Sequence, residues 1–312
     1  MAAQKAPTES IITVEPVPGD GPDVFRSVSS LHDQKNARSV FGGILISHAI
    51  GAASQTVPPG YVVCSSKSSF IRPAAGEETI KYAVERTADT RGFVTRLVRA
   101  YQGPEKLLLY LSTITFQNKK SSAPRYILTY GLPPPDLGGI KPDDIPKASL
   151  PQIMHWSTKQ DFPVHDRNYL KFREPCDWRP CEFTVVDEPT EYRMYGFVRS
   201  PEISTDSPGM HMAAIGCISD SYIIGPSLYA NISKVGRMIE NVAMAVSLNH
   251  SVVFHDFDAK ADQWMVCERQ SSWGGDGRVL THQRIWNVET GCLVISCTQE
   301  GIARIKDASF KL

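Results

Sequence analysis

The sequence predicts an α+β protein in which one structural unit, an antiparallel sheet wrapped around a long central helix, occurs twice. Two segments, residues 40–56 and 212–228, carry apolar and small side chains at the spacing of a helix. Each of them precedes four β-rich segments that are separated by turn residues. Because 312 residues exceed one domain of ordinary size, the recurrence of this order favours two copies of one unit.

The first helix is expected over residues 40–56. Its apolar face follows the i, i+3, i+4, i+7 spacing and consists of Phe41, Ile44, Leu45, His48, Ala49 and Ala52. Gly42 and Gly43 at its start have no Cβ, so another backbone can approach closely there. The Pro-Pro-Gly run at residues 58–60 is expected to end the helix.

Four strands are expected after this helix, at Tyr61–Ile71, Thr79–Thr87, Phe93–Gln102 and Lys106–Gln117. Beyond them the pattern gives way to Lys, Ser and Pro, with three consecutive prolines at Pro133–Pro135 that cannot continue a helix or a central strand. We therefore divide the chain into an N-terminal unit at residues 1–118, a Pro-rich linker at 119–164 and a C-terminal unit at 165–312.

The second half repeats this order. A helix is expected over Met212–Leu228, followed by strands at Val246–His255, Gln263–Ser272, Val279–Val288 and Leu293–Ile305. The closest internal match sets residues 92–99 beside 278–285, with Thr95 opposite Thr281, and Gly274–Gly277 is expected to be a hairpin turn. Both helices are apolar around much of their circumference, which is expected of a helix enclosed by a sheet, the double hot-dog architecture.

Composition restricts the class of protein. Hydrophobic residues make up 42% and charged residues 21%, and 33 basic residues balance 33 acidic ones, so we expect a globular protein that does not bind nucleic acid. The seven cysteines, an odd number without a preceding secretory signal, favour a reducing, cytoplasmic environment. Cys176 and Cys181 have no nearby ligands to complete a zinc site, so no metal or cofactor is expected. The sequence also contains no apolar run long enough to span a membrane.

Asp220 is the first residue that suggests chemistry. It lies in the interior of the expected helix, where aspartate is a poor helix former and has no helix terminus to cap. Helical spacing surrounds it with small and apolar residues, namely Gly216, Cys217, Ile223 and Ile224. Partial burial would raise the pKa of its carboxyl group and make it a better general base. The alternative is a structural role, in which Asp220 satisfies backbone groups near the following turn.

Ser247 and Gln299 are further candidates on the expected strands. Gln299 follows the run Leu293–Thr298, and a buried glutamine must find hydrogen-bond partners, either in a site or within the sheet. His250 and His255, five residues apart, are expected on opposite faces of their strand and in structural roles. The sequence has no nucleophile-elbow motif, phosphate-binding loop or dinucleotide fingerprint, which disfavours serine-hydrolase and nucleotide chemistry.

Several short motifs resemble the acyl-CoA thioesterase II family. Those of its first half are Phe41–Gly43, Ser68–Pro73, Arg91–Arg96 and Phe116-Gln117. Those of its second half are Ser219-Asp220, Asn249–Ser251 with Phe254-His255, Gln263-Trp264 and Gln299–Gly301. They occur in the family's order and span roughly residues 35–117 and 165–305.

The resemblance implies a double hot-dog thioester hydrolase with a catalytic Asp, Thr and Gln that hold and polarise one water. These roles fall on Asp220, Ser247 and Gln299, which we call the candidate trio. Asp220 would take the proton of the water while the other two orient it, without a covalent intermediate. Gly42, Gly43 and His250 are expected to contact the substrate, with backbone N–H groups at the two glycines stabilising the developing oxyanion.

The sequence departs from the family pattern at three positions: Ser247 replaces Thr, Ile44 replaces Gln, and Asn249 replaces Asp. Serine keeps the hydroxyl group, whereas the other two changes suggest a specialised paralogue. The alternative function is a double hot-dog protein that binds an acyl thioester without hydrolysing it, because a fold does not fix a function. A hot-dog hydratase is disfavoured, since the expected His and acidic pair is absent from the helices.

The expected substrate is a thioester of coenzyme A or of an acyl carrier protein, and the resemblance suggests a homo-oligomer. A cytoplasmic location is expected, with the peroxisomal matrix as the alternative. The chain ends in Phe310-Lys311-Leu312, in which Phe310 replaces the serine of the Ser-Lys-Leu signal.

Overall fold

The structure, a computed structural model, describes residues 7–28, 39–121, 128–145, 176–181, 188–236 and 241–306. The first half contains α1 (Pro7–Ile12), β1 (Val14–Pro16), β2 (Val24–Ser27), α2 (Gly42–Ser54), β3 (Tyr61–Phe70), β4 (Lys81–Asp89), β5 (Phe93–Gln102) and β6 (Leu107–Asn118). The second contains β7 (Asp177–Pro180), β8 (Arg193–Arg199), α4 (Pro208–Asp220), α5 (Gly225–Tyr229), α6 (Ile232–Val235), β9 (Val242–Phe254), β10 (Met265–Gly275), β11 (Arg278–Asn287) and β12 (Leu293–Ile305). Short 3-10 turns occur at Lys119–Ser121, Pro142–Asp144 and Pro189–Glu191.

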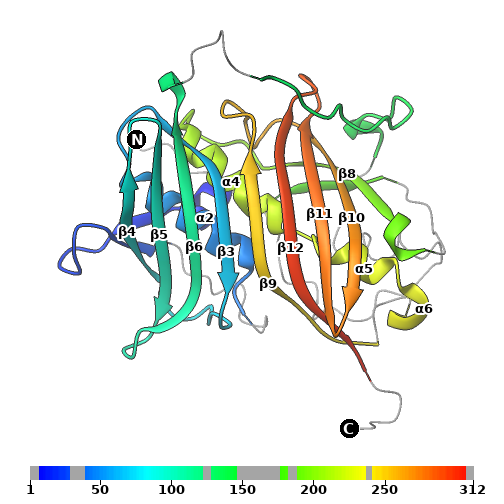
Figure 1. Cartoon of the computed structure of the whole chain (residues 1–312), viewed down its shortest axis with the longest axis horizontal. Helices are drawn as coiled ribbons and strands as arrows, with labels where there is room; N and C mark the ends of the chain where they lie inside the picture. Colours follow the sequence, from blue (N-terminus) through cyan, green and yellow to red (C-terminus); the bar gives the residue numbers. More distant parts are fainter. Residues whose placement is uncertain are drawn as a thin grey trace.

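The strands of the described residues form one antiparallel sheet with the order β1-β2-β4-β5-β6-β3-β9-β12-β11-β10-β8-β7 (Figure 1). β3 and β9 join the two halves, and Lys67 of β3 pairs with Ser251 of β9. Counted outward from this pair, β6 corresponds to β12, β5 to β11 and β4 to β10. The halves are therefore related by an approximate two-fold axis that passes between β3 and β9.

The two long helices, α2 and α4, lie together behind the sheet in the view of Figure 1. They run antiparallel: Gly43 at the start of α2 faces Cys217 near the end of α4, and Gly209 at the start of α4 faces Ser54 at the end of α2. In each helix ten of the 13 residues are buried, which explains why neither has a polar face. This is the double hot-dog architecture expected from the sequence.

Most of the predicted elements are confirmed. The strands Phe93–Gln102 and Leu293–Ile305 have the predicted bounds, and the predicted hairpin turn is present, with Asp276 and Gly277 in the left-handed conformation (φ 52° and 72°) between β10 and β11. The sequence did not indicate the short strands β1, β2, β7 and β8, which lie at the two ends of the sheet. They are three to seven residues long, too short for a clear alternation of polar and apolar positions.

Two expectations about the second half were wrong. The helix predicted over residues 212–228 begins at Pro208 and ends at Asp220, and a turn separates it from α5. The match of Thr95 with Thr281 is displaced by one residue, because Thr281 is buried on the inner face of β11 whereas its inward counterpart on β5 is Arg96. A shift of one residue along a strand exchanges its two faces, so a weak similarity does not determine the register.

Some predicted segments lie wholly or partly outside the residues that the structure describes. Residues 122–127 and 146–164 of the predicted linker and the terminal Phe310-Lys311-Leu312 lie outside the described residues, and the division into units stays a prediction. The seven cysteines are free. Among the described residues there is no group of acidic, His and Cys side chains that could hold a metal ion, and no helix long and apolar enough to cross a membrane.

Candidate active site

Asp220 is the last residue of α4. The sequence-based expectation that it lies in the helix interior was wrong. The helix stops because Ser221 has an extended backbone and Tyr222 adopts the left-handed conformation (φ 55°). Consequently Ile223 and Ile224 do not follow Asp220 on the same helix. The turn leaves the carboxyl group at the end of α4 and only 6% of the residue exposed.

Ser247 and Gln299 reach this carboxyl group from two neighbouring strands. Gln299 of β12 pairs with His250 of β9, and Gly301 pairs with Ser247. Leu248 is the extra residue of a β-bulge between these pairs, and the bulge returns Ser247 to the inner face of the sheet. Gln299 Nε2 donates a hydrogen bond of 2.6 Å to Ser247 Oγ.

Asp220 has a strongly perturbed acidity. Burial, the largest effect, raises the pKa of its carboxyl group to about 7. Hydrogen bonds from Gln299, from the backbone of Gly43 and from Ser247 lower this pKa and so favour the carboxylate. The candidate trio and the start of α2 therefore meet at one point, and the pKa lies where a base works best at neutral pH.

The start of α2 is fitted tightly against the end of α4. A Cβ placed on Gly42 would lie 2.7 Å from Oδ2 of Asp220, and one on Gly43 would lie 2.5 Å from the carbonyl oxygen of Cys217. Neither position has room for a side chain. The paired glycines thus allow the N-terminal backbone of α2 to reach the carboxylate, where the helix dipole also favours negative charge.

Two acceptor atoms of the candidate trio are left without partners. Asp220 Oδ1 and Gln299 Oε1 are buried and have no hydrogen bond in the part of the chain that the structure describes. Buried polar atoms of this kind are rare and call for an explanation. In number these two acceptors match the two O–H donors of a single water molecule, the molecule that a hydrolytic site must hold and polarise.

His250 lies beside the candidate trio, with its side chain 1% exposed. Its Nε2 contacts Ser219 Oγ at 3.2 Å and Cys297 Sγ at 3.0 Å, whereas Nδ1 has no partner among the described residues. Burial lowers the pKa of the imidazole to about 4, so the ring is neutral at physiological pH. His250 packs behind the residue that precedes Asp220, and its predicted contact with substrate stays a prediction.

The other two departures from the family pattern are at Ile44 and Asn249. Ile44 is buried in the hydrophobic core on α2. Asn249 is exposed, donates to Glu300 Oε2 at 3.0 Å and accepts from Ser69 Oγ at 2.9 Å. Neither side chain is among the groups that affect the acidity of Asp220.

The inner face of the second half carries polar side chains that sequence reasoning missed. Thr281 pairs with Gln299 in the sheet. The hydroxyl group of Ser227 on α5 forms 3.0 Å hydrogen bonds with the hydroxyl groups of Thr281 and Ser271. One row further along, Gln283 and Arg269 form a 2.6 Å hydrogen bond. The signal was present as polar residues at every second position of β10 and β11, but only the true register shows that these positions face inward.

The corresponding positions of the first half lack this chemistry. When the two-fold axis relates the strands of the two halves, Ile114 corresponds to Gln299 and Val63 corresponds to Ser247. Ser54, the last residue of α2, takes the place of Asp220. The inward position occupied by Thr281 holds Arg96, which is fully buried and donates to Thr56. At the positions related to the candidate trio, the described part of the first half thus has no carboxyl group.

Comparisons with known proteins identify the family of the chain. Residues 31–117 match a family model described as the acyl-CoA thioesterase N-terminal domain, and residues 142–303 match one described as the acyl-CoA thioesterase C-terminal domain. The chain is 31% identical to the peroxisomal acyl-coenzyme A thioester hydrolase 1 of Saccharomyces cerevisiae, with 85% of this chain and 86% of that protein covered. It is 26% identical to human acyl-coenzyme A thioesterase 8, with 95% and 88% covered.

Among solved structures, the acyl-CoA thioesterase II TesB2 from Mycobacterium marinum is similar, with a TM-score of 0.73 and 23% identity. The similarity covers 97% of this chain and 100% of that one. A hot-dog protein from Alicyclobacillus acidocaldarius has a TM-score of 0.70 at 16% identity, with 95% and 97% covered. These structures share the fold of this chain.

Proposed function

The chain belongs to the acyl-CoA thioesterase family, and from this premise we propose that it hydrolyses acyl-CoA thioesters with a water activated by Asp220. The observation that carries the proposal is the buried carboxyl group with a pKa of about 7, between Ser247, Gln299 and the start of α2. A protein that only binds its ligand gains nothing from burying a carboxyl group at this cost. The products are a free acid and coenzyme A.

In the proposed reaction Asp220 is the general base. One water donates its two O–H groups to Asp220 Oδ1 and Gln299 Oε1, the acceptors without protein partners. Ser247 is held by Gln299 and hydrogen-bonds the carboxyl group, which keeps Asp220 in position. As the water attacks the thioester carbonyl carbon, its proton passes to Asp220, and general-base catalysis of this kind contributes about a hundredfold to ten-thousandfold.

The oxyanion of the tetrahedral intermediate forms near the start of α2. The N–H of Gly43 already hydrogen-bonds Asp220, so we assign the oxyanion contact to the N–H of Gly42. The positive end of the helix dipole adds to this stabilisation. Asp220 then returns its proton to the departing thiolate sulfur, and the carboxyl group is ready for another turnover.

The alternative is a protein that binds an acyl thioester without hydrolysing it. Thiol release from a panel of acyl-CoA esters, measured with purified wild-type protein, separates the two functions. Hydrolysis predicts release that is proportional to enzyme concentration. Tight binding of an ester without release would support the binding protein and overturn the proposal.

The carrier, the assembly and the location are finer questions. Coenzyme A is the proposed carrier, because the relatives are named for it.

A homo-oligomer and a cytoplasmic location stay predictions, and the peroxisomal matrix is the alternative suggested by the name of the yeast relative. Microscopy of the tagged protein with and without Lys311-Leu312 tests the location: loss of peroxisomal signal on deletion would favour the alternative.

A further inference from the structure

Ser219, the residue before Asp220, is held by the sheet from two sides. Its carbonyl oxygen accepts a hydrogen bond of 2.9 Å from Gln283 Nε2 on β11, and its Oγ lies 3.2 Å from His250 Nε2 on β9. β12, the strand of Gln299, lies between β9 and β11. All three side chains at this contact are buried. The two strands beside that of Gln299 thus hold the residue that precedes the base.

The hydrogen bond between Ser219 and His250 has one direction. Ser219 Oγ donates its own hydrogen to the carbonyl oxygen of Gly216 at 2.7 Å, so it accepts from the imidazole. Burial lowers the pKa of the imidazole to about 4, and a hydrogen bond to the backbone of Ser219 opposes this effect, as expected of a donor. We therefore place the single ring proton of the neutral His250 on Nε2.

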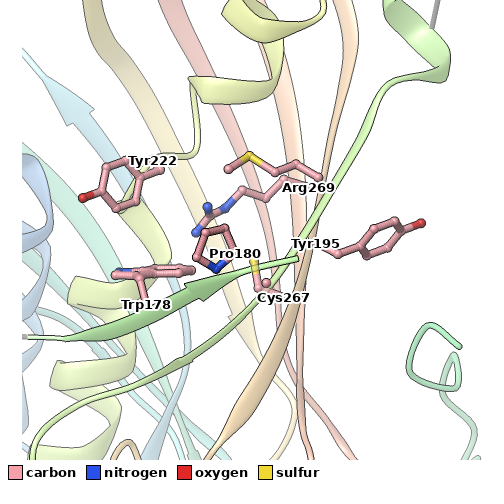
Figure 2. A pocket seen from close by; sticks show the side chains of 8 residues that line it. Trp178, Pro180, Tyr195, Tyr222, Cys267 and Arg269 are labelled. Atoms are coloured by element: carbon pink, nitrogen blue, oxygen red, sulfur yellow. The ribbon is translucent and has the colours of Figure 1, made fainter. Parts of the chain in front are cut away.

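The amide of Gln283 is also fixed in orientation. Arg269 Nε lies 2.6 Å from Gln283 Oε1. Because a guanidinium group has no acceptor atom, its partner is the amide oxygen, and the amide nitrogen faces Ser219. Figure 2 shows Arg269 beside Trp178, and its guanidinium carbon lies 4.4 Å from the centre of that ring. The arginine, held by the ring, thus orients the glutamine that donates to Ser219.

The corresponding positions of the first half hold three apolar residues and one serine. Under the two-fold axis the counterparts of Ser219, Gln283, Arg269 and His250 are, in this order, Ala53, Val98, Val84 and Ser66. Ser66 hydrogen-bonds Ser112 of the sheet at 2.9 Å. The same architecture thus forms in the first half with a different set of contacts, so the fold itself does not require those at Ser219.

The ends of the two long helices are satisfied differently. The carbonyl oxygen of Ala53 accepts from the backbone N–H of Thr56 at 3.0 Å and from its hydroxyl group at 2.8 Å. In α4 the extended Ser221 and the left-handed Tyr222 carry the chain away from the helix end. The last carbonyl groups of a helix need donors from elsewhere. The sheet supplies one where the chain breaks off after Asp220.

We propose that His250 and Gln283 are positioning residues, which hold Ser219 and through it the carboxyl group of Asp220. This inference rests on the proposed hydrolysis and adds two residues to its machinery. A base at the last residue of a helix moves with the helix end, and a displacement of about 1 Å costs about a hundredfold in rate. The role requires no contact between His250 and the substrate.

Steady-state thiol release tests the proposal. His250→Leu and Gln283→Met are each expected to lower kcat by about tenfold to a hundredfold and to leave KM unchanged, because the base is displaced while the substrate still binds. His250→Gln places an amide N–H near the position of Nε2 and should recover most of the loss. Ser66→Ala, at the corresponding position of the first half, also removes a buried polar group and should keep the wild-type kcat.

Ser219→Ala is the mildest variant, because alanine occupies the corresponding position of α2. It removes the hydroxyl group that His250 holds and should lower kcat about tenfold. Folded variants whose kcat stays within about threefold of wild type, or whose losses lie in KM alone, would overturn the inference while the proposed hydrolysis stands.

Hydrogen–deuterium exchange provides a measurement without turnover. Amides of residues 217–222 should exchange about tenfold faster in His250→Leu and Gln283→Met than in wild type, and at the wild-type rate in Ser66→Ala. Unchanged exchange of these amides in both variants would also overturn the inference. Absence of thiol release by wild type from every acyl-CoA ester would contradict the proposed function, and the exchange rates would still decide whether the two residues hold the end of α4.

Discussion

Gly42 is the first residue of α2 and Asp220 is the last residue of α4, and because the helices are antiparallel these two residues meet. A Cβ on Gly42 would lie only 2.7 Å from Oδ2 of Asp220. The base is supplied by the second half of the chain and the backbone that faces it by the first half. Neither half alone contains both. The proposed site therefore depends on the packing of α2 against α4, and changes at that contact should affect activity without touching a polar side chain.

Gly43→Ala tests this contact. A Cβ at Gly43 would meet the backbone carbonyl of Cys217 at 2.5 Å, so the helices must separate and the substitution should cost a few kcal/mol of stability and most of the activity. Gly209→Ala, at the corresponding place on α4, is the control, because its nearest neighbours are 3.8 Å away. Urea unfolding and turnover are measured for both. Equal tolerance of the two substitutions would show that the close contact has no importance.

Removal of either orienting group should slow the reaction without abolishing binding. Ser247→Ala and Gln299→Ala are each expected to lower kcat by about a hundredfold, because a misplaced nucleophile costs about that much. Since the two side chains are hydrogen-bonded at 2.6 Å, the double variant should lose less than the product of the single losses. Steady-state kinetics of the three variants measures this. Independent, multiplicative losses would argue against a shared water.

The pH dependence of the rate follows from the acidity of Asp220. A general base acts only when deprotonated, and the pKa of Asp220 is about 7, so log(kcat/KM) should rise with pH below 7 and level off above it. His250 does not contribute to this rise, because the pKa of its imidazole is lowered to about 4. A rate profile from pH 5 to 9 checks the midpoint. A flat profile over that range would exclude Asp220 as the base.

The free energy of unfolding should fall as pH rises, whereas the rate should increase. The pKa of Asp220 is raised from 3.8 in the unfolded chain to about 7 in the fold, so the folded state holds the proton more tightly. The contribution of this group is complete below about pH 4 and is lost as pH rises towards and through 7. Asp220→Asn cannot ionise and should unfold at a higher urea concentration than wild type at pH 8, but not at pH 4. Equal midpoints at pH 8 would contradict the buried carboxylate.

Much of the fold could be predicted from the sequence because the long strands alternate in burial and the turns have strong signals. The strand at Phe93–Gln102, for example, has a buried side chain at every second position from Val94 onward. The end of α4 was not predictable in the same way. It depends on the left-handed backbone of Tyr222, a conformation that tyrosine does not favour and that no local pattern announces.

The candidate site was only partly accessible from the sequence. Asp220, Ser247 and Gln299 were identified through a resemblance, and the structure brings them to one point. The bulge at Leu248 determines that Ser247 faces inward, and simple alternation from His250 would have turned it outward. Arg269 was missed for a related reason: whether an arginine on a strand faces the core or the solvent is decided by register and not by residue type.

The most direct test of the account is the turnover number of Asp220→Asn at pH 8, where the wild-type carboxyl group is mostly ionised. Asparagine preserves shape and removes the base. The account predicts that kcat falls about a hundredfold to ten-thousandfold, while Ser54→Ala at the corresponding position of α2 stays at the wild-type rate. A folded Asp220→Asn protein that hydrolyses its best ester within tenfold of the wild-type rate would contradict the claim that Asp220 activates the water.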